Sequence, residues 1–219
     1  MNQIQKVKIQ CKTACNSISG RLPYCWDLNV YRGCGHGCKY CFAIYSHDYL
    51  DAWQYKKTEK DTFFNTIYLK ENIVEQLERQ LTSPNWKGEV INLGGVTDNY
   101  QPWEKENGIM TEILKVLIKY KNPCIISTKS DLILRDFDLI DQLSKMTYVN
   151  IAATITCIDK ELAAKIEPAA ALPAHRFNML KAFQKTDAVT GVHDMPIIPF
   201  LTDTDEILES LFEGGWRST

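Results

Sequence analysis

The chain has 219 residues, of which 45% are hydrophobic and 24% charged, and its formal net charge is −2. These values are typical of a globular protein that buries a core, and the net charge gives no global drive toward nucleic acid. No run reaches the roughly 18 apolar residues of a membrane span, and the N-terminus lacks the apolar stretch of a secretory signal. We therefore expect a cytoplasmic protein without a membrane segment.

Short β-rich runs alternate with segments of helical period along the chain. The expected strands span residues 26–31, 89–93, 124–128, 148–156 and 191–198. Apolar residues recur on one helical face within 73–81, 109–120, 137–143 and 177–183. Asp203 can cap a last helix over 205–213. The alternation predicts an α/β fold with right-handed βαβ units and a parallel sheet.

The expected domain organisation is an N-terminal extension, residues 1–24, before one domain, residues 25–219. Ligands of parallel α/β sheets bind at the carboxyl ends of the strands. The residues with chemical potential fall there. Three cysteines follow the first run, Gly94, Gly95 and Asp98 follow the second, and Lys129 follows the third.

The segment YRGCGHGCKYCFA places Cys34, Cys38 and Cys41 in a C-x3-C-x2-C spacing with interleaved glycines. Clustered cysteines in a chain without a secretory signal favour metal binding over disulfides. Thiolates are soft ligands that suit iron–sulfur clusters or zinc. A four-iron cluster takes four thiolates, so three cysteines leave one iron open for chemistry.

Zinc is the other metal that these residues allow. Its fourth ligand would be His36, His47 or Cys25. The familiar zinc pattern pairs two short Cys/His units, and only Cys38 and Cys41 have that spacing. The motif therefore favours an iron–sulfur cluster.

The motif resembles that of the radical S-adenosylmethionine (SAM) superfamily, and ordered blocks over roughly residues 25–205 resemble its spore photoproduct lyase-like branch. The blocks are LNVYRGCGHGCKYCFA, LGGVTDNYQPWE, ISTKSDLILRDFDLI, IEPAAALPAHR and MPIIPFLTD. The resemblance implies a partial (β/α) TIM-like barrel of the radical SAM type. It also implies a four-iron, four-sulfur (4Fe–4S) cluster that cleaves S-adenosylmethionine reductively to a 5′-deoxyadenosyl radical, which abstracts hydrogen from a substrate.

The resemblance assigns the cluster to the three cysteines and several further residues to S-adenosylmethionine. Tyr40 and Phe42 match positions on the adenine side, and Gly94 and Gly95 match a turn that meets the methionine amino group. Lys129 matches a lysine that reaches the cofactor. Thr154 lies on the strand that lines the cofactor site. An ordinary turn and a surface lysine are the alternatives at the glycines and at Lys129.

Four further residues are candidate substrate contacts. Asp98 and Glu104 lie in the TDNYQPWE block, and Glu167 and Arg176 match an acid and a base after the fourth strand. Glu167 and Arg176 can instead form an internal ion pair, which is the slightly favoured alternative.

Two departures limit the resemblance. Spore photoproduct lyase has a cysteine beside the second-strand turn that returns a hydrogen atom to the product radical, whereas Gly95 aligns there. The sequence also stops at GGWRST, so we expect about five βα units, a missing sixth unit and a C-terminally shortened barrel. The fifth strand would then have an open edge.

We therefore expect a radical SAM enzyme with a lyase-like reaction on an unknown substrate. The resemblance implies reduced flavodoxin or ferredoxin as the electron donor. A DNA photoproduct repair enzyme and a non-enzymatic zinc or cluster-binding module are the alternatives. DNA is the less favoured ligand, because Gly95 cannot donate hydrogen and the chain is not strongly basic.

Overall fold

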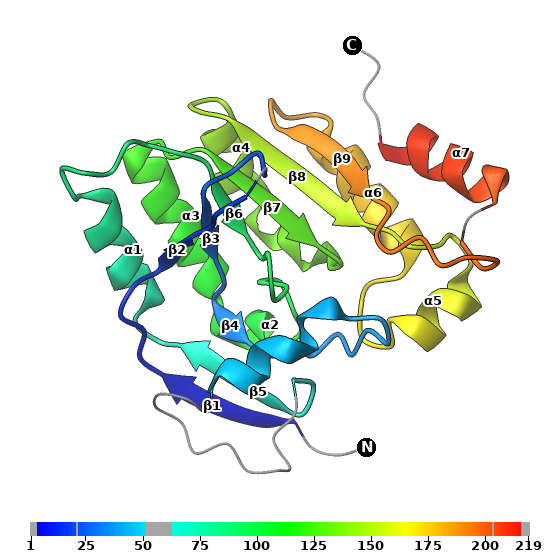
Figure 1. Ribbon diagram of the computed structural model, residues 1–219. Coiled ribbons are helices and arrows are strands. Elements are labelled where there is room, and N and C mark those ends of the chain that lie inside the picture. Colours follow the sequence, from blue (N-terminus) through cyan, green and yellow to red (C-terminus); the bar gives the residue numbers. More distant parts are fainter. Residues whose placement is uncertain (1–3, 21, 51–62, 203, 216–219) are drawn as a thin grey trace.

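The computed structural model describes residues 4–20, 22–50, 63–202 and 204–215. The larger of two sheets has the strand order β2-β3-β6-β7-β8-β9, and the smaller has the order β1-β5-β4 (Figure 1). The strands are β1 (Gln5–Ile9), β2 (Cys15–Ser17), β3 (Trp26–Leu28), β4 (Tyr31–Arg32), β5 (Thr66–Lys70), β6 (Ile91–Leu93), β7 (Cys124–Thr128), β8 (Val149–Thr154) and β9 (Val189–His193).

Helices follow the strands of the larger sheet in the order that the sequence predicts. The α-helices are α1 (Ile73–Leu81), α2 (Glu104–Asn107), α3 (Ile109–Tyr120), α4 (Phe137–Ser144), α5 (Lys160–Ile166), α6 (Pro173–Phe183) and α7 (Asp205–Gly215), and η1 (Phe42–Leu50) and η2 (Asp131–Asp136) are 3₁₀-helices. None of the described helices is long and apolar enough to cross a membrane.

Strands β3, β6, β7, β8 and β9 pair in parallel, and β2 pairs antiparallel with β3. Strands β6, β7, β8 and β9 are each followed directly by a helix, and β3 leads through β4, η1 and β5 to α1, so the described residues contain five βα units. This confirms the predicted α/β fold with a partial TIM-like barrel. Strand β2 comes from the predicted N-terminal extension and lengthens the main sheet.

The two faces of the larger sheet differ in chemistry because side chains alternate along a strand. Ile91, Ile126 and Ile151 point to one face and are fully buried. On that face α3 and α4 lie behind the sheet in Figure 1. Asn92 and Asn150 point to the other face and line a cavity. The hydrophobic core therefore lies between the sheet and its helices, and the opposite face is free for chemistry.

Two features of the fold differ from the sequence expectation. The smaller sheet was not predicted, although all five residues of β5 are buried. The expected strand 191–198 ends at His193, and Pro196 and Pro199 follow. Proline lacks the N–H that a strand ladder needs, which explains the early end. The predicted cap residue Asp203 lies outside the described residues.

Candidate functional site

A cavity of about 900 Å³ opens over the polar face of the larger sheet. This volume is at the upper end of the range for small-molecule sites, roughly 300–1,000 Å³, so the cavity has room for a nucleoside-sized cofactor and a second molecule. The lining residues are Pro23, Tyr24, Cys34, His36, Cys38, Tyr40, Cys41, Phe42, Asn92, Gly94, Gly95, Val96, Thr97, Asp98, Ile125, Ser127, Thr128, Lys129, Tyr148, Asn150, Thr154, His193, Met195 and Pro196.

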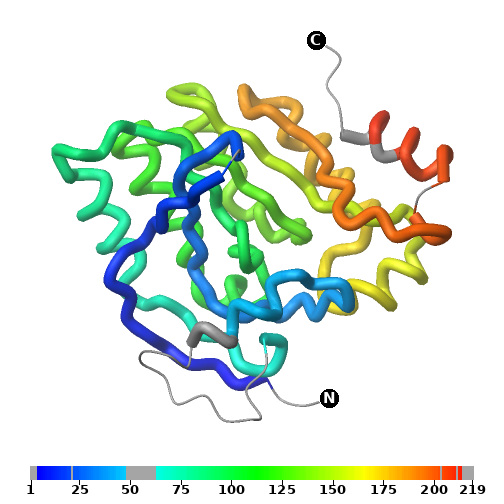
Figure 2. Tube along the Cα trace, viewed as in Figure 1, coloured from blue at the N-terminus to red at the C-terminus, as the bar shows by residue number. Residues whose placement is uncertain are grey.

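The three motif cysteines line this cavity together. They lie on loop 33–41, the segment after β4 that runs toward α5 in Figure 2. Cys34 and Cys38 are 8% and 7% exposed, and Cys41 is half-buried. The described residues include no three His, Cys, Asp or Glu side chains already gathered as a metal site. The thiols thus share a loop and a cavity, and their all-sulfur chemistry suits an iron–sulfur cluster or zinc.

Without metal, the buried cysteines hold their protons. Burial raises the pKa of Cys34 to about 12, and the negative charge of Asp98 adds to this shift. Burial likewise raises the pKa of Cys38 to about 11, although the charge of Lys129 opposes it, and raises the pKa of Cys41. Metal binding here has to release protons, because the thiolate is the ligand.

Loop 33–41 takes its shape from a glycine and from one glutamine. Gly33 has a φ of 83°, and a Cβ there would lie 2.6 Å from the carbonyl oxygen of Thr66. The buried amide of Gln101 accepts a hydrogen bond from Gly35 N at 2.8 Å and donates one to Gly33 O at 3.1 Å. Only glycine fits at position 33, and the two opposed hydrogen bonds fix the loop against the β6–α2 segment.

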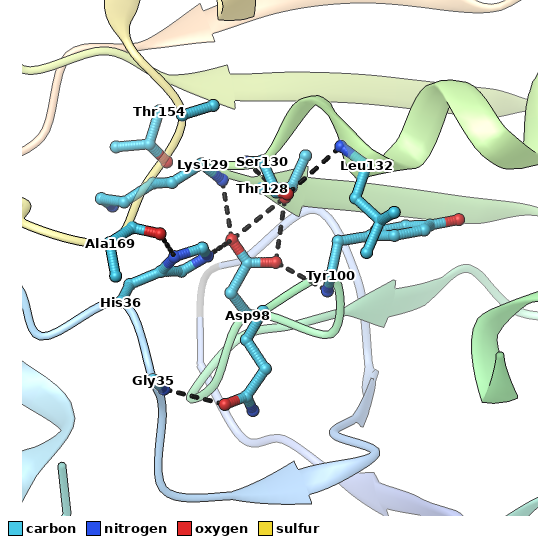
Figure 3. Close-up of polar contacts among 12 residues, drawn as sticks. Gly35, His36, Asp98, Tyr100, Thr128, Lys129, Ser130, Leu132, Thr154 and Ala169 are labelled. Atoms are coloured by element: carbon cyan, nitrogen blue, oxygen red, sulfur yellow. Dashed lines mark hydrogen bonds and ion pairs between the residues drawn. The ribbon is translucent and has the colours of Figure 1, made fainter. Parts of the chain in front are cut away.

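His36, which belongs to loop 33–41, contacts Asp98 with 2.9 Å between Nε2 and Oδ2. The two side chains are 2% and 9% exposed. Asp98 also accepts hydrogen bonds from the amides of Tyr100 and Lys129 and from the hydroxyl of Thr128 (Figure 3). Burial would raise the pKa of Asp98, but the charge and hydrogen bond of His36 hold that pKa below its usual value. Asp98 lines the cavity, but protein donors already engage both of its oxygens.

The glycine turn after β6 rests on a buried carboxylate. Gly94 has a φ of 99°, and a Cβ on Gly95 would lie 2.5 Å from Oδ1 of Asp27. Asp27 accepts hydrogen bonds from the amide of Gly95 at 3.1 Å and from the side chain of Asn92 at 2.8 Å. Burial raises the pKa of Asp27 against these hydrogen bonds. Asp27 therefore fills the space that a side chain at position 95 would need.

Asn29 holds the same turn through its side chain, and Lys70 in turn holds Asn29. Oδ1 of Asn29 accepts hydrogen bonds from the amides of Val96 and Thr97 at 2.9 and 3.0 Å. Nζ of Lys70 donates to the carbonyl oxygen of Asn29 at 2.6 Å. Burial lowers the pKa of Lys70 to about 8, and the nearby charge of Arg32 lowers it further.

Tyr40, Lys129 and Thr154 line a common side of the cavity. The hydroxyl of Tyr40 contacts Thr156 at 2.9 Å and donates to Glu167. Nζ of Lys129 lies over the ring of Tyr40, 5.7 Å from its centroid. Thr154, 8% exposed, ends β8. These three predicted cofactor contacts are thus brought together beside the cysteines.

Glu167 and Arg176 form a buried ion pair in which each side chain is 1% exposed. Arg176 also donates to the carbonyl oxygens of Ala171 at 2.7 Å and Thr154 at 2.6 Å. Neither partner lines the cavity. Of the two roles that the sequence allowed, the structure shows the internal ion pair.

Glu104 lies away from the cavity, contrary to its prediction as a substrate contact. Its side chain is fully buried, and its carboxylate accepts hydrogen bonds from the hydroxyl of Tyr31 at 2.6 Å and from the amide of Met110 at 2.9 Å. It also pairs with Arg135 at 2.9 Å. These donors satisfy the carboxylate of Glu104 within the core, so it does not face the cavity. Phe42, by contrast, lines the cavity and is 70% exposed.

Strand β9 supplies the more open side of the cavity. Burial, with a contribution from the charge of Lys129, lowers the pKa of His193, so the ring is neutral at pH 7. Met195 follows and is 59% exposed. Sequence reasoning did not single out His193, Asp27 or Asn29. The available signal was their position at the carboxyl ends of strands, where DLN and GVHD carry polar residues.

Comparison with known proteins places this chain in one family. The family model described as the radical SAM superfamily matches residues 28–211. An uncharacterised protein of Mycobacterium tuberculosis is 33% identical over 207 residues, which are 93% of this chain and 59% of that protein. An uncharacterised protein of Methanocaldococcus jannaschii is 29% identical over 213 residues, which are 94% of this chain and 73% of that protein. The chain therefore spans about three fifths of the length of the mycobacterial relative.

Solved structures of spore photoproduct lyase share the fold. A variant with bound AdoMet and dinucleoside spore photoproduct superposes with a TM-score of 0.69 at 11% identity, covering 95% of this chain and 56% of that chain. Another structure, complexed with dinucleoside spore photoproduct, gives a TM-score of 0.66 at 12% identity with the same coverage. At this identity the likeness establishes the fold alone.

Proposed function

The chain belongs to the radical SAM superfamily, and we propose that it is an enzyme that holds a 4Fe–4S cluster on Cys34, Cys38 and Cys41 and cleaves S-adenosylmethionine. When bound, such a cluster would supply one electron to break a carbon–sulfur bond of the cofactor, giving methionine and a 5′-deoxyadenosyl radical that would take a hydrogen atom from the substrate. The observation that carries the proposal is three thiols of one loop lining the same cavity as the Gly94–Gly95 turn.

The residues around the thiols have proposed roles in binding S-adenosylmethionine. Lys129 supplies a cation for the cofactor carboxylate. The backbone of Gly94 and Gly95 meets the amino group, because a glycine turn allows close approach. Tyr40 and Phe42 face the adenine side. Thr154 closes the same side of the cavity from β8.

Three buried side chains keep that binding surface in place. Asp27 and Asn29 hold the amides of the glycine turn from below. The Glu167 carboxylate, paired with Arg176, receives the Tyr40 hydroxyl, which ties the cysteine loop to the α5–α6 segment. A site fixed in this way is oriented before the cofactor arrives.

A zinc module is less well supported because the extra ligands are engaged elsewhere or lie outside the cavity. Both ring nitrogens of His36 face protein oxygens. His47 does not line the cavity, and its Nε2 contacts the carbonyl oxygen of Thr66 at 3.1 Å. Cys25 is exposed and does not line the cavity. Within the described part of the chain, three thiols and no gathered fourth protein ligand suit a cluster with one open iron better than a closed zinc site.

DNA photoproduct repair is the narrower alternative reaction. The solved structures named above contain that product class, but position 95 of this chain is glycine. A Cβ there would collide with Asp27, so the turn has no room for a hydrogen-donating cysteine. We therefore propose the cofactor cleavage without that repair chemistry.

The electron for cleavage comes, in this proposal, from reduced flavodoxin or ferredoxin. A reducing cytoplasm is the compartment that the proposal requires, because the eight cysteines are free thiols.

Anaerobic reconstitution with iron and sulfide tests the proposal. We expect about four irons per chain and, with dithionite and S-adenosylmethionine, release of 5′-deoxyadenosine. Cys38→Ala should abolish that release, whereas Cys25→Ala, an exposed cysteine outside the cavity, should retain it. A fully loaded cluster that cleaves no cofactor, or a protein that takes up one zinc and no iron, contradicts the proposal.

A further inference from the structure

The imidazole of His36 is fixed at both ends within the cysteine loop. Nδ1 lies 3.1 Å from the carbonyl oxygen of Ala169, and Nε2 lies 2.9 Å from Oδ2 of Asp98 (Figure 3). The amide of Ala169 in turn donates to the carbonyl oxygen of His36 at 3.1 Å. A side chain that is 2% exposed thus joins the cysteine loop to two other segments.

The partners of the ring define what each nitrogen does. A backbone carbonyl can only accept, so Nδ1–H donates to Ala169. Asp98 accepts from Lys129 N at 2.7 Å through the same oxygen that meets His36, and from Tyr100 N at 2.8 Å through the other. Nε2 of His36 thus meets a carboxylate that backbone donors already hold in place.

Asp98 connects the three parts of the site. It lies in the same segment as the Gly94–Gly95 turn, accepts the amide of Lys129 after β7, and contacts the loop of Cys34 and Cys38 through His36. The cysteine ligands, the glycine turn and the lysine therefore share one buried carboxylate. The contacts are complete without metal.

We propose that His36 and Asp98 are positioning residues whose buried contact fixes the cysteine loop against the glycine turn and Lys129. This role concerns the metal-free chain, and its effect on a bound cluster rests on the proposed function. Outer-shell groups of this kind typically change metal affinity or activity by about 10- to 100-fold when removed.

The metal-free chain tests the positioning role through cysteine accessibility. Pulse alkylation followed by peptide mass analysis reports the labelling of Cys34 and Cys38 independently of cluster loading. We expect Asp98→Asn to speed their labelling about tenfold or more, because a charge-assisted hydrogen bond is lost. His36→Gln, which keeps a donor toward Asp98, should have a smaller effect in the same direction.

The chain offers a matched control on its surface. His175 and Asp131 also form a His–Asp contact, 3.4 Å apart, but their side chains are 56% and 45% exposed. His175→Gln and Asp131→Asn should leave the labelling of Cys34 and Cys38 unchanged. If Asp98→Asn and His36→Gln label like these controls, the positioning role is wrong, whatever the protein does with iron.

The reduction potential of the loaded protein gives a second readout, which rests on the proposed function. Asp98→Asn removes a carboxylate beside the cysteine loop and should raise the potential, whereas Asp131→Asn on the surface should leave it unchanged. Equal potentials for the two variants would show that Asp98 does not act on the cluster. If no cluster loads, the proposed function fails and the labelling alone decides the inference.

Discussion

The cavity has two walls that are built in different ways. The loop wall consists of loop 33–41, the 94–98 turn and residues 128–129, and the β9 wall consists of residues 191–196. Buried hydrogen bonds and ion pairs cross the loop wall, from Gln101, Asp98 and Asp27. On the β9 wall Met195 is 59% exposed, and among the described residues both carboxylate oxygens of Asp194 are buried without a hydrogen-bond partner.

Under the proposed function, this difference separates two tasks of the site. The proposed cofactor chemistry needs a fixed arrangement of binding groups, and the buried contacts of the loop wall keep one. We propose that a substrate is recognised on the more open β9 wall, which presents a neutral histidine and exposed apolar side chains. We therefore expect substitutions in the loop wall, or in the buried residues that support it, to cost stability and those in the β9 wall to be tolerated.

The largest effect should come from the ion pair behind the loop wall. Arg176→Met leaves the carboxylate of Glu167 buried without its cation and should lower the free energy of unfolding by about 3–5 kcal/mol. Chemical denaturation measures this. Lys181→Met on the exposed face of the same helix should change it by less than about 0.5 kcal/mol. Equal losses of unfolding free energy in the two variants would show that the buried ion pair supports the fold no more than a surface lysine does.

The buried Lys70 under the loop wall should give a pH-dependent effect. Its pKa is lowered to about 8 by burial and by Arg32, whereas an unfolded lysine titrates near 10.5. Between these pH values the unfolded chain binds more protons, so the contribution of Lys70 to stability rises with pH by about 3 kcal/mol.

Chemical denaturation between pH 7 and pH 10.5 isolates this contribution. The unfolding free energy of the wild type, minus that of Lys70→Met, should increase across the range. The variant cancels the titration of the cysteines, whose raised pKa values act in the opposite direction. A difference that is constant or falls with pH would show that Lys70 is not desolvated in the folded chain.

Two glycines compare the walls directly. Gly95→Ala should destabilise the chain by about 1–3 kcal/mol, because its Cβ would collide with the buried carboxylate of Asp27. Gly191→Ala on β9 should be nearly neutral, because nothing lies within 4 Å of a Cβ there. Thermal or chemical denaturation measures both, and similar losses at the two positions would show that the walls are equally packed.

The smallest effect is expected at His193 on the β9 wall. His193→Gln keeps a polar, uncharged side chain, so iron content and cofactor cleavage without substrate should stay within about twofold of the wild type. Iron analysis and 5′-deoxyadenosine release measure this. A loss of cleavage similar to that of Cys38→Ala would make β9 part of the cofactor site.

The sequence predicted the fold and the loop-wall residues better than their contacts. Runs rich in Val, Ile, Thr and aromatic residues, separated by segments of helical period, identified the five parallel strands, and spacing identified the cysteine loop. Glu104 and Asp98 could not be assigned, because a carboxylate looks the same in sequence whether it faces a cavity or Tyr31 and Arg135. The smaller sheet was missed because its paired strands β1 and β5 lie about 60 residues apart in the sequence, and no local pattern indicates that they pair.

The central claim is that three thiols of the loop wall hold a cluster whose fourth iron is open to S-adenosylmethionine. Mössbauer spectroscopy of the protein reconstituted with ⁵⁷Fe, recorded with and without S-adenosylmethionine, tests this directly. We predict that one iron in four changes its spectrum when the cofactor is added. Four irons that stay equivalent with the cofactor present would contradict the account.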